Sequence, residues 1–291
     1  GESCVMEISL LDENEVRYKV SQIKSLPPLP LALQRMLDII INEVDSPDEL
    51  VSFISYDQTL AARILCVANS AHYGFRGKAP NLTRSVIVIG YDEVKSICVY
   101  ELMSEIFSGQ TSIGRAEREK LWKHAFATAR IAYHIAQRRP WVSKNEAYLL
   151  GLLHDLGRVA MAVHFKEEYR SIQKLAQDRK VPLRYVEPQF GVYHTLVGKW
   201  ISIRWSFPKH FQAVIEFHHE PEKSPLFKPE VRIIALANIL ANSKMYPEYL
   251  DDDFTRLYCQ KLHITNEEWE EYRSRMGQLW PEVDLFWSLL K

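Results

Sequence analysis

The sequence of 291 residues predicts an all-α protein built from many helices. Apolar residues recur along most of the chain with the three- and four-residue spacing of one helix face, whereas the strict alternation of a half-buried strand is scarce. Helix-start signals support the same fold class. In the stretch "SPDEL", Ser46 suits the capping position, Pro47 suits the first helical position, and Glu49 follows three residues after the cap.

The N-terminal part of the chain, residues 1–110, is expected to form a helical subdomain. The segment "LPPLP" at 26–30 is interpreted as a rigid entry into the first of its helices. Asp57 suits the cap of a later helix, and Gly90 is suited to the left-handed position of a tight helix–helix turn. Besides the helix that Ser46 caps, the expected helices cover residues 31–44, 58–71, 82–89 and 91–107.

The C-terminal part, residues 111–291, is expected to form a second helical subdomain, against which the first one packs. A polar, glycine-containing stretch from Ser108 to Glu119 marks the expected boundary. Two or three further helices, rich in tryptophan, are expected to complete the chain as a C-terminal extension. The helices expected before this extension cover residues 120–139, 145–165, 167–179, 195–205, 209–220 and 230–246.

Composition and charge argue against several classes of partner. The net charge is −1, so the chain lacks the basic field that draws proteins to phosphate backbones, and nucleic acid is not expected as a partner. The helix pair around Gly90 has the outline of a helix-turn-helix, but its few basic residues disfavour DNA binding. No apolar run approaches the roughly 20 residues of a membrane span, and no signal peptide is visible. We therefore expect a cytoplasmic protein without a membrane partner. The four cysteines lie far apart and are expected to be reduced, buried thiols.

The stretch "YLLGLLHDLGRVAMAV", residues 148–163, places ionisable residues in an apolar helix. Burying a carboxylate without a partner costs on the order of several kcal/mol, so His154 and Asp155 require partners. One candidate is Arg158, which could form a simple ion pair with Asp155 three residues earlier. The other candidate is a metal ion.

Further polar residues lie on the apolar faces of other helices. His218 falls on the buried stripe of its helix with His219 beside it, and Asn238 lies on the buried stripe of a later helix. His124 borders the apolar face of its helix, and His194 stands just before the helix at 195–205.

Each of these residues, taken singly, has an ordinary interpretation as a hydrogen-bonded core residue. Five histidines and an aspartate at buried or half-buried positions of four helices favour a metal site, because neutral imidazoles and a carboxylate suit Zn, Fe and Mn. We therefore predict one or two divalent transition-metal ions, although the residues alone leave both interpretations open.

The order of these polar residues resembles the HD superfamily of metal-dependent phosphohydrolases: an early histidine, an HD pair, a further histidine, an HH pair, and a polar residue in "LANIL". The stretches "LPPLPLALQRMLDI", "ISYDQTLAARILCVANSAHYG" and "LTRSVIVIGYDEVKSICV" look like the opening of an HDOD domain, the HD-related output domain of bacterial signalling proteins. "EPQFGVYHTLVGKWISIRWSFPKHFQAVIEFHHEP" looks like its later signature. The resemblance covers roughly residues 21–245 and implies an all-α fold with a regulatory role.

The resemblance also implies roles for single residues. His124 matches the first histidine of the superfamily, and His154 with Asp155 matches the HD pair. The extra histidines of the related HD-GYP phosphodiesterases are matched by His194, His218 and His219.

Three departures from the pattern bear on activity. Asn238 stands where the last ligand of the superfamily is an aspartate, and a neutral amide binds a hard cation more weakly. Arg158 stands where HD-GYP proteins carry a lysine. After His219 the chain reads "EPEKSPLFKPE", without the GYP signature, which disfavours cleavage of cyclic di-GMP.

Two functions are compatible with these observations. The first is a bacterial signalling module that acts through a protein partner and retains a metal site. The second is a metal-dependent phosphohydrolase that acts on a phosphoester or nucleotide. In that enzyme Asp155 and the histidines would hold the metal, and Arg158 or a nearby lysine would hold the phosphate of a phosphorylated small molecule.

Overall fold

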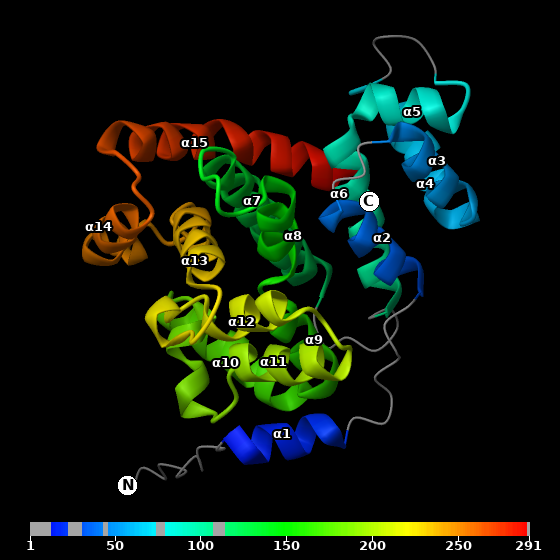
Figure 1. Ribbon diagram of the computed structural model, residues 1–291. Helices are drawn as coiled ribbons and strands as arrows, with labels where there is room; N and C mark the ends of the chain where they lie inside the picture. The colour runs from blue at the N-terminus through cyan, green and yellow to red at the C-terminus, as the bar shows by residue number, and fades with distance from the viewer. Residues whose placement is uncertain (1–12, 23–30, 43–45, 74–78, 107–113, 290–291) are drawn as a thin grey trace, which may run out of the picture. The chain divides into compact units, whose positions relative to one another are not determined.

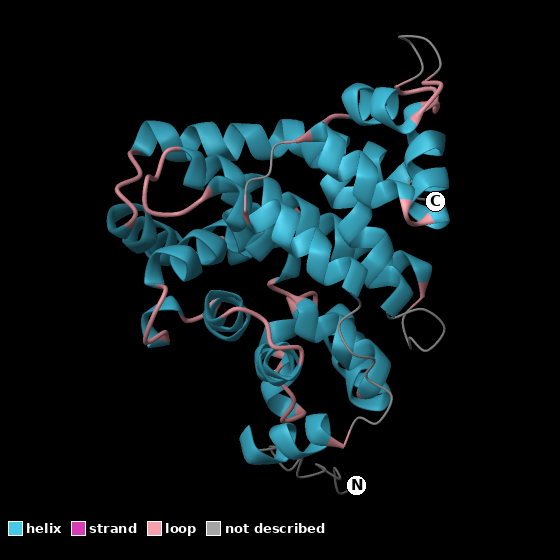
Figure 2. Ribbon diagram, turned by 45° about the vertical axis from the view of Figure 1, so that its right-hand side comes forward, coloured by secondary structure: helices cyan, strands magenta, loops and turns pink. Residues whose placement is uncertain are grey.

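The computed structural model describes residues 13–22, 31–42, 46–73, 79–106 and 114–289. Within these ranges all regular structure is helical and no strand occurs, so the predicted all-α fold class is confirmed (Figure 2). The segment "LPPLP" lies outside the described residues. Among the described residues, no helix combines the length and the apolar character that a membrane crossing requires.

The α-helices follow one another along the chain as Figure 1 labels them. Two short 3-10 turns, η2 (Leu183–Tyr185) and η3 (Glu187–Gln189), precede α11. The α-helices are α1 (Glu13–Ser21), α2 (Leu31–Ile41), α3 (Pro47–Ser55), α4 (Gln58–Ala68), α5 (Leu82–Ile89), α6 (Tyr91–Ile106), α7 (Arg115–Gln137), α8 (Lys144–Leu153), α9 (Leu156–His164), α10 (Lys166–Arg179), α11 (His194–Arg204), α12 (Lys209–Phe217), α13 (Lys228–Asn242), α14 (Asp252–Lys261) and α15 (Asn266–Leu289).

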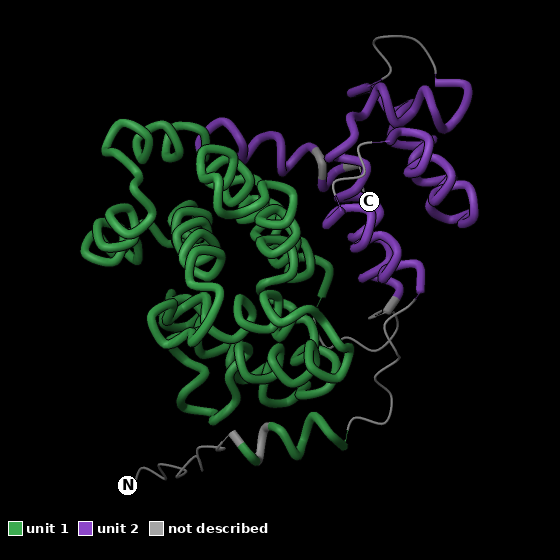
Figure 3. The backbone as a smooth tube through the Cα atoms, viewed as in Figure 1, with its two compact units in different colours: residues 1–26, 109–276 green, residues 27–108, 277–291 purple. Residues whose placement is uncertain are grey.

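The chain divides into two compact units (Figure 3). Unit 1 contains residues 1–26 and 109–276, and unit 2 contains residues 27–108 and 277–291. Each unit therefore joins two separate stretches of the chain, and α15 begins in unit 1 and ends in unit 2.

Unit 2 has an apolar core between short helices. Helix α6 packs against α2, α4 and α5, and α3 packs against α4 and α5. Leu33, Ile64 and Ile97 contribute to this core and have no exposed surface.

The helix starts in unit 2 follow from their capping residues. The hydroxyl of Ser46 accepts a hydrogen bond from the backbone N–H of Glu49 at 3.4 Å, as the capping signal predicts. The carboxylate of Asp57 accepts one from the N–H of Thr59 at 2.8 Å. Gly90 separates α5 from α6 with a φ of +102°, a conformation that favours glycine because it has no Cβ.

Two groups of helices surround the predicted site in unit 1. Helix α7 packs against α8 and α13, while α11 packs against α9 and α12 (Figure 1). Helix α12 also contacts α8 and α13, so it joins the two groups. Helix α1 packs on α11, where Arg204 donates to the backbone carbonyl of Val20 at 3.2 Å. The polar sequence of α1 carries no strong helix signal, and it has no counterpart among the predicted helices.

The HD pair lies at a break between two helices, so the expectation of one helix over 145–165 is wrong. Helix α8 ends at Leu153, and α9 begins at Leu156. His154 caps the end of α8 and Asp155 precedes α9. Both helices are buried on most sides, so the apolar run continues through the break and periodicity gives no sign of it.

Helices α9 and α11 approach each other closely at two glycines. A Cβ on Gly157 would overlap the carbonyl oxygen of His194, and one on Gly198 would lie 3.1 Å from the backbone nitrogen of Gly157. The backbones can therefore approach this closely only because both side chains are absent. This contact brings the HD pair at the start of α9 next to His194 at the start of α11.

Candidate metal centre

Unit 1 brings all of the predicted metal ligands into one cluster. They come from α7, the α8–α9 break, the start of α11, the end of α12, and α13. All are buried except the half-buried His219. Helix α12 ends three residues earlier than predicted, so its two histidines follow the helix instead of lying in it. The cluster consists of His124, His154, Asp155, His194, His218, His219 and Asn238.

The carboxylate of Asp155 lies at the centre of the cluster. Its Oδ2 atom is 3.5 Å from Nε2 of His154 and 3.7 Å from Nε2 of His124. Its Oδ1 atom is 3.4 Å from Nε2 of His194 and 3.6 Å from Nε2 of His218. Both oxygens are buried, and neither accepts a hydrogen bond from any described residue.

Three of these histidines are oriented by acceptors on the far side of the ring. Nδ1 of His154 lies 2.6 Å from the carbonyl oxygen of Gly151, and Nδ1 of His218 lies 3.1 Å from that of Val214. Nδ1 of His194 lies 2.7 Å from both carboxylate oxygens of Glu187. Because these oxygens can only accept, each Nδ1 carries the proton and each Nε2 presents a lone pair. Outer partners of this kind orient metal-binding imidazoles.

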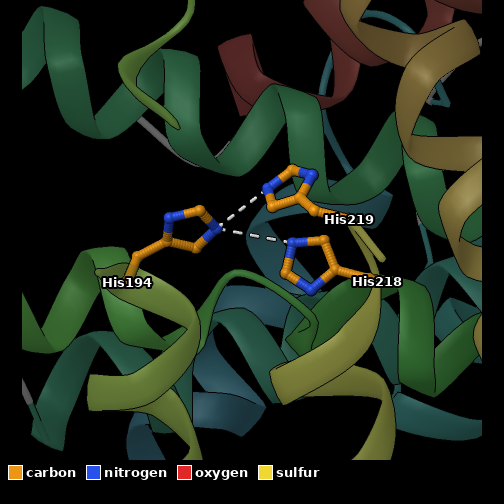
Figure 4. A group of neighbouring side chains, drawn as sticks. All are labelled: His194, His218 and His219. Carbon is orange, nitrogen blue, oxygen red and sulfur yellow. Dashed lines mark hydrogen bonds between the residues drawn. The ribbon is translucent and has the colours of Figure 1, made fainter. Parts of the chain in front are cut away.

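The possible ligand atoms fall into two groups, within each of which they lie no more than 4.8 Å apart. His124, His154 and Asp155 form the first group. The second group contains the remaining three histidines, and Figure 4 shows His194 facing both His218 and His219. Atoms bound to one ion at about 2.1 Å lie about 3.0 to 3.4 Å apart, so small shifts would fit the cluster to metal. The two oxygens of Asp155 face different groups, since Oδ2 lies next to the first group and Oδ1 next to the second.

Asn238 directs its side-chain oxygen towards the first group. Its Oδ1 lies 2.8 Å from Nε2 of His124 and accepts a hydrogen bond from Nδ2 of Asn242 at 3.1 Å. Because an amide oxygen only accepts, Nε2 of His124 carries a proton and donates it to Oδ1 of Asn238. Asn238 therefore offers a neutral oxygen ligand where a carboxylate would supply a negative charge.

The electrostatics of the cluster favour neutral imidazoles around an ionised carboxylate. Burial lowers the pKa of His124 to about 3 and also lowers the pKa values of His154 and His218. Burial acts to raise the pKa of Asp155, but the Arg158 guanidinium holds it well below its usual value. Neutral imidazole and ionised carboxylate are the protonation states that bind metal.

Arg158, the second predicted catalytic residue, lies between the cluster and a pocket. Its Nε atom is 3.3 Å from Oδ2 of Asp155, which is within ion-pair distance. The pocket has a volume of about 520 Å³ and is lined by Arg158 and His124 together with Lys120, Lys180 and Tyr246. The cluster is therefore accessible from a cavity large enough for a small organic molecule.

Two residues that matter here were missed in the sequence. Glu187 is buried in η3 and binds the ring of His194. Arg184, in η2, donates to Nδ1 of His219 at 3.1 Å. An acidic residue seven positions before His194 was the only available signal for Glu187, and the role of Arg184 depends on a tertiary contact that no spacing indicates.

Comparison with known proteins identifies the family. The family model of the HDOD domain matches residues 26–221. An uncharacterized protein of Treponema pallidum (strain Nichols) is 24% identical over 221 residues, which are 75% of this chain and 42% of that protein. The chain thus spans less than half the length of this relative.

Two solved structures share the fold. An HDOD domain protein of unknown function from Geobacter sulfurreducens is 23% identical, with a TM-score of 0.64 over 92% of this chain and 99% of the other. A candidate signal-transduction protein from Marinobacter aquaeolei VT8 is 18% identical, with a TM-score of 0.80 over 98% of this chain and 68% of the other. Because the family model matches well over half of the sequence, the chain belongs to the HDOD domain family.

Proposed function

We propose that this chain is a cytoplasmic regulatory HDOD module that retains an HD-type metal centre and acts through a protein partner in bacterial signalling. One observation carries the metal centre. The Asp155 carboxylate is buried without a hydrogen-bond donor among the described residues, and four imidazole Nε2 atoms surround it. Arg158 forms an ion pair with Oδ2, but three of the four imidazoles turn a lone pair towards the carboxylate. A metal ion between these atoms would relieve their mutual repulsion.

The two oxygens of Asp155 would bind metal together with different histidines. Oδ2 of Asp155 would bind with His124 and His154, and Oδ1 would face His194 and His218. A bound divalent ion would supply Lewis-acid chemistry and lower the pKa of a coordinated water. The Glu187 carboxylate keeps the ring of His194 turned towards the site.

The regulatory part of the proposal is supported by where the ligands come from. They lie on α7, α11 and α13, at the α8–α9 break and after α12, so binding would stabilise the packing of unit 1 as a whole. The family and the signal-transduction name of the Marinobacter protein support the same role.

A metal-dependent phosphohydrolase is the second candidate, and the pocket beside the cluster favours it. Arg158 stands between Asp155 and the pocket, which is also lined by Lys120 and Lys180 and by the carboxylates of Glu117 and Glu248. A guanidinium binds a phosphate through paired hydrogen bonds. The class of substrate would be a phosphorylated small molecule, held with its phosphate next to the metal ligands.

Metal analysis of the purified chain tests the proposal. We expect at least about one Zn, Fe or Mn ion per chain, and we expect Asp155→Ala to lose it because the carboxylate ligand is gone. Asp178→Ala, an exposed aspartate of α10, is the matched control and should keep the metal. Metal-free wild-type protein after loading with each ion would contradict the proposal.

A phosphoester screen then separates the two candidate functions. Phosphomonoesters, phosphodiesters and nucleotides are offered to the metal-loaded chain and to the Asp155→Ala variant. Turnover that Asp155→Ala abolishes would establish the hydrolase. Metal binding without turnover on any class would favour the regulatory module.

A further inference from the structure

A chain of hydrogen bonds fixes the tautomer of His219. Nη1 of Arg184 lies 3.1 Å from Nδ1 of His219. A guanidinium has no acceptor, so Arg184 donates and Nδ1 of His219 accepts. Because Nδ1 accepts, it carries no proton, so the single proton of the ring lies on Nε2.

The same chain continues through His194 to a buried carboxylate. Nε2 of His219 lies 3.1 Å from Nε2 of His194, and Nδ1 of His194 lies 2.7 Å from the carboxylate of Glu187. The proton on Nε2 of His219 is thus donated to the lone pair of His194, whose own proton is donated to Glu187. The hydrogen bonds therefore run in one direction. They begin at the cationic guanidinium of Arg184 and end at the anionic carboxylate of Glu187.

Arg184 is held in place from its other side. Its Nη2 donates to the hydroxyl of Tyr185 at 2.7 Å, and its guanidinium carbon lies 4.7 Å from the centre of the Tyr185 ring. The ring of Tyr185 in turn lies 5.0 Å from that of Tyr249. The packing of the η2 turn therefore holds Arg184 in contact with His219.

The two groups of metal ligands consequently differ. In the second group, Nε2 of His219 presents a proton where a metal would need a lone pair, and Nε2 of His194 is already engaged. In the first group Nε2 of His124 also carries a proton, which it donates to Oδ1 of Asn238. Among the described residues, however, nothing binds Nδ1 of His124 or Nε2 of His154. The proton of His124 can therefore move to Nδ1 and leave a lone pair on Nε2, whereas Arg184 occupies Nδ1 of His219.

We propose that Arg184 closes the second ion position, so that the native chain holds a single ion at His124, His154 and Asp155. The inference rests on the proposed metal centre and specifies how many ions it binds. Removing Arg184 frees Nδ1 of His219 to take the proton, which turns a lone pair on Nε2 towards His194 and His218. Arg184 is accordingly a residue that sets metal stoichiometry without touching the first ion.

Ion counting on folded protein tests this inference. The wild-type chain and Arg184→Met are loaded with Zn²⁺, freed of excess metal and analysed by mass spectrometry. We expect about one ion per chain in the wild type and a twofold increase in Arg184→Met. Arg170→Met, at an exposed arginine of α10 that pairs with Glu167, is the control and should keep the wild-type content. Adding His219→Ala to Arg184→Met should remove the second ion.

The outcomes separate this inference from the metal centre itself. Two ions in the wild type, or one ion in a folded Arg184→Met variant, would overturn the role of Arg184 and leave the metal centre standing. No ion in either protein would overturn both. A measurement on the wild-type chain tests the inference independently. Imidazole ¹⁵N NMR, assigned with a His219→Gln variant, should show the proton of His219 on Nε2. A proton on Nδ1 would refute the inference even if Arg184→Met did not fold.

Discussion

Units 1 and 2 bury polar side chains in different ways. In unit 2 the buried hydroxyl of Ser85 donates to the carbonyl of Asn81 at 2.8 Å, and that of Ser96 donates to the carbonyl of Asp92 at 2.9 Å. In unit 1 the buried carboxylate of Asp155 has no donor among the described residues. Unit 2 thus satisfies these buried hydroxyls within its own helices. Unit 1 pairs its buried carboxylate with Arg158 and surrounds it with imidazoles that can bind a cation.

This difference predicts that the two units respond differently to substitution, acid and metal. Unit 2 should behave as an ordinary apolar core whose stability follows buried area. Unit 1 should depend on conditions that change the charge of its polar cluster. Hydrogen exchange read by mass spectrometry can follow the helices of both units separately in one sample.

The largest effect is expected at the contact between α9 and α11. Gly157→Ala places a methyl group against the carbonyl of His194, where backbone must move, so we expect unit 1 to lose about 4 kcal/mol or more. Gly277→Ala, at a helical glycine with open space around it, is the control and should stabilise α15 by about 0.5 to 1 kcal/mol. Chemical denaturation measures both, and a Gly157→Ala variant as stable as wild type would contradict the close contact.

Acid should weaken unit 1 of the metal-free chain before unit 2. Burial lowers the pKa of His124 to about 3 and also lowers the pKa values of His154, His218 and His219, so these rings stay neutral when folded. Once unfolded they take up protons below about pH 6.5, and each proton costs about 1.4 kcal/mol per pH unit. The stability they contribute is complete above that pH and falls as the pH drops towards 3.

Hydrogen exchange between pH 7.5 and 5.5 checks this prediction after correction for intrinsic rates. The helices of unit 1 should lose protection while α2 to α6 keep theirs, because His72, the one histidine of unit 2, is exposed. Earlier loss of protection in α2 to α6 would contradict the comparison.

The next largest loss of stability is expected when a truncated side chain leaves a cavity in the core of either unit. Ile64 and Ile234 are both fully buried, in unit 2 and unit 1 respectively. Truncation of either to alanine should cost about 3 kcal/mol with metal present. Addition of a chelator should leave the loss of unfolding free energy caused by Ile64→Ala unchanged. In the Ile234→Ala variant the chelator should destabilise unit 1 further. Equal responses of the two variants to the chelator would show that metal does not distinguish the units.

Asn238→Asp should produce the smallest change. It replaces the neutral oxygen beside His124 with a charged one, so we expect the affinity for divalent metal to rise about tenfold, or about 1.4 kcal/mol. Competition with a coloured chelator measures the change. Asn266→Asp, at an exposed position, should leave the affinity as it is. An affinity unchanged in Asn238→Asp would mean that this side chain does not reach the ion.

The sequence predicts most of the helices and the residues of the polar cluster. It does not predict how the side chains of this cluster are arranged. Ser46 and Asp57 carry capping chemistry that acts within a few residues, so local patterns located the starts of α3 and α4. The break at the HD pair was missed because burial on both sides continues the apolar run. Glu187 and Arg184 were missed because they act on His194 and His219 through contacts formed only when η2, η3 and α12 pack together.

The most direct test of the metal centre is an anomalous difference map from crystals of the wild-type chain soaked in Zn²⁺. The metal-centre proposal predicts a peak about 2.1 Å from Oδ2 of Asp155 and Nε2 of His154. The role assigned to Arg184 predicts no second peak between His194, His218 and His219. A map without a peak at Asp155 would contradict the proposal that this buried carboxylate is a metal ligand.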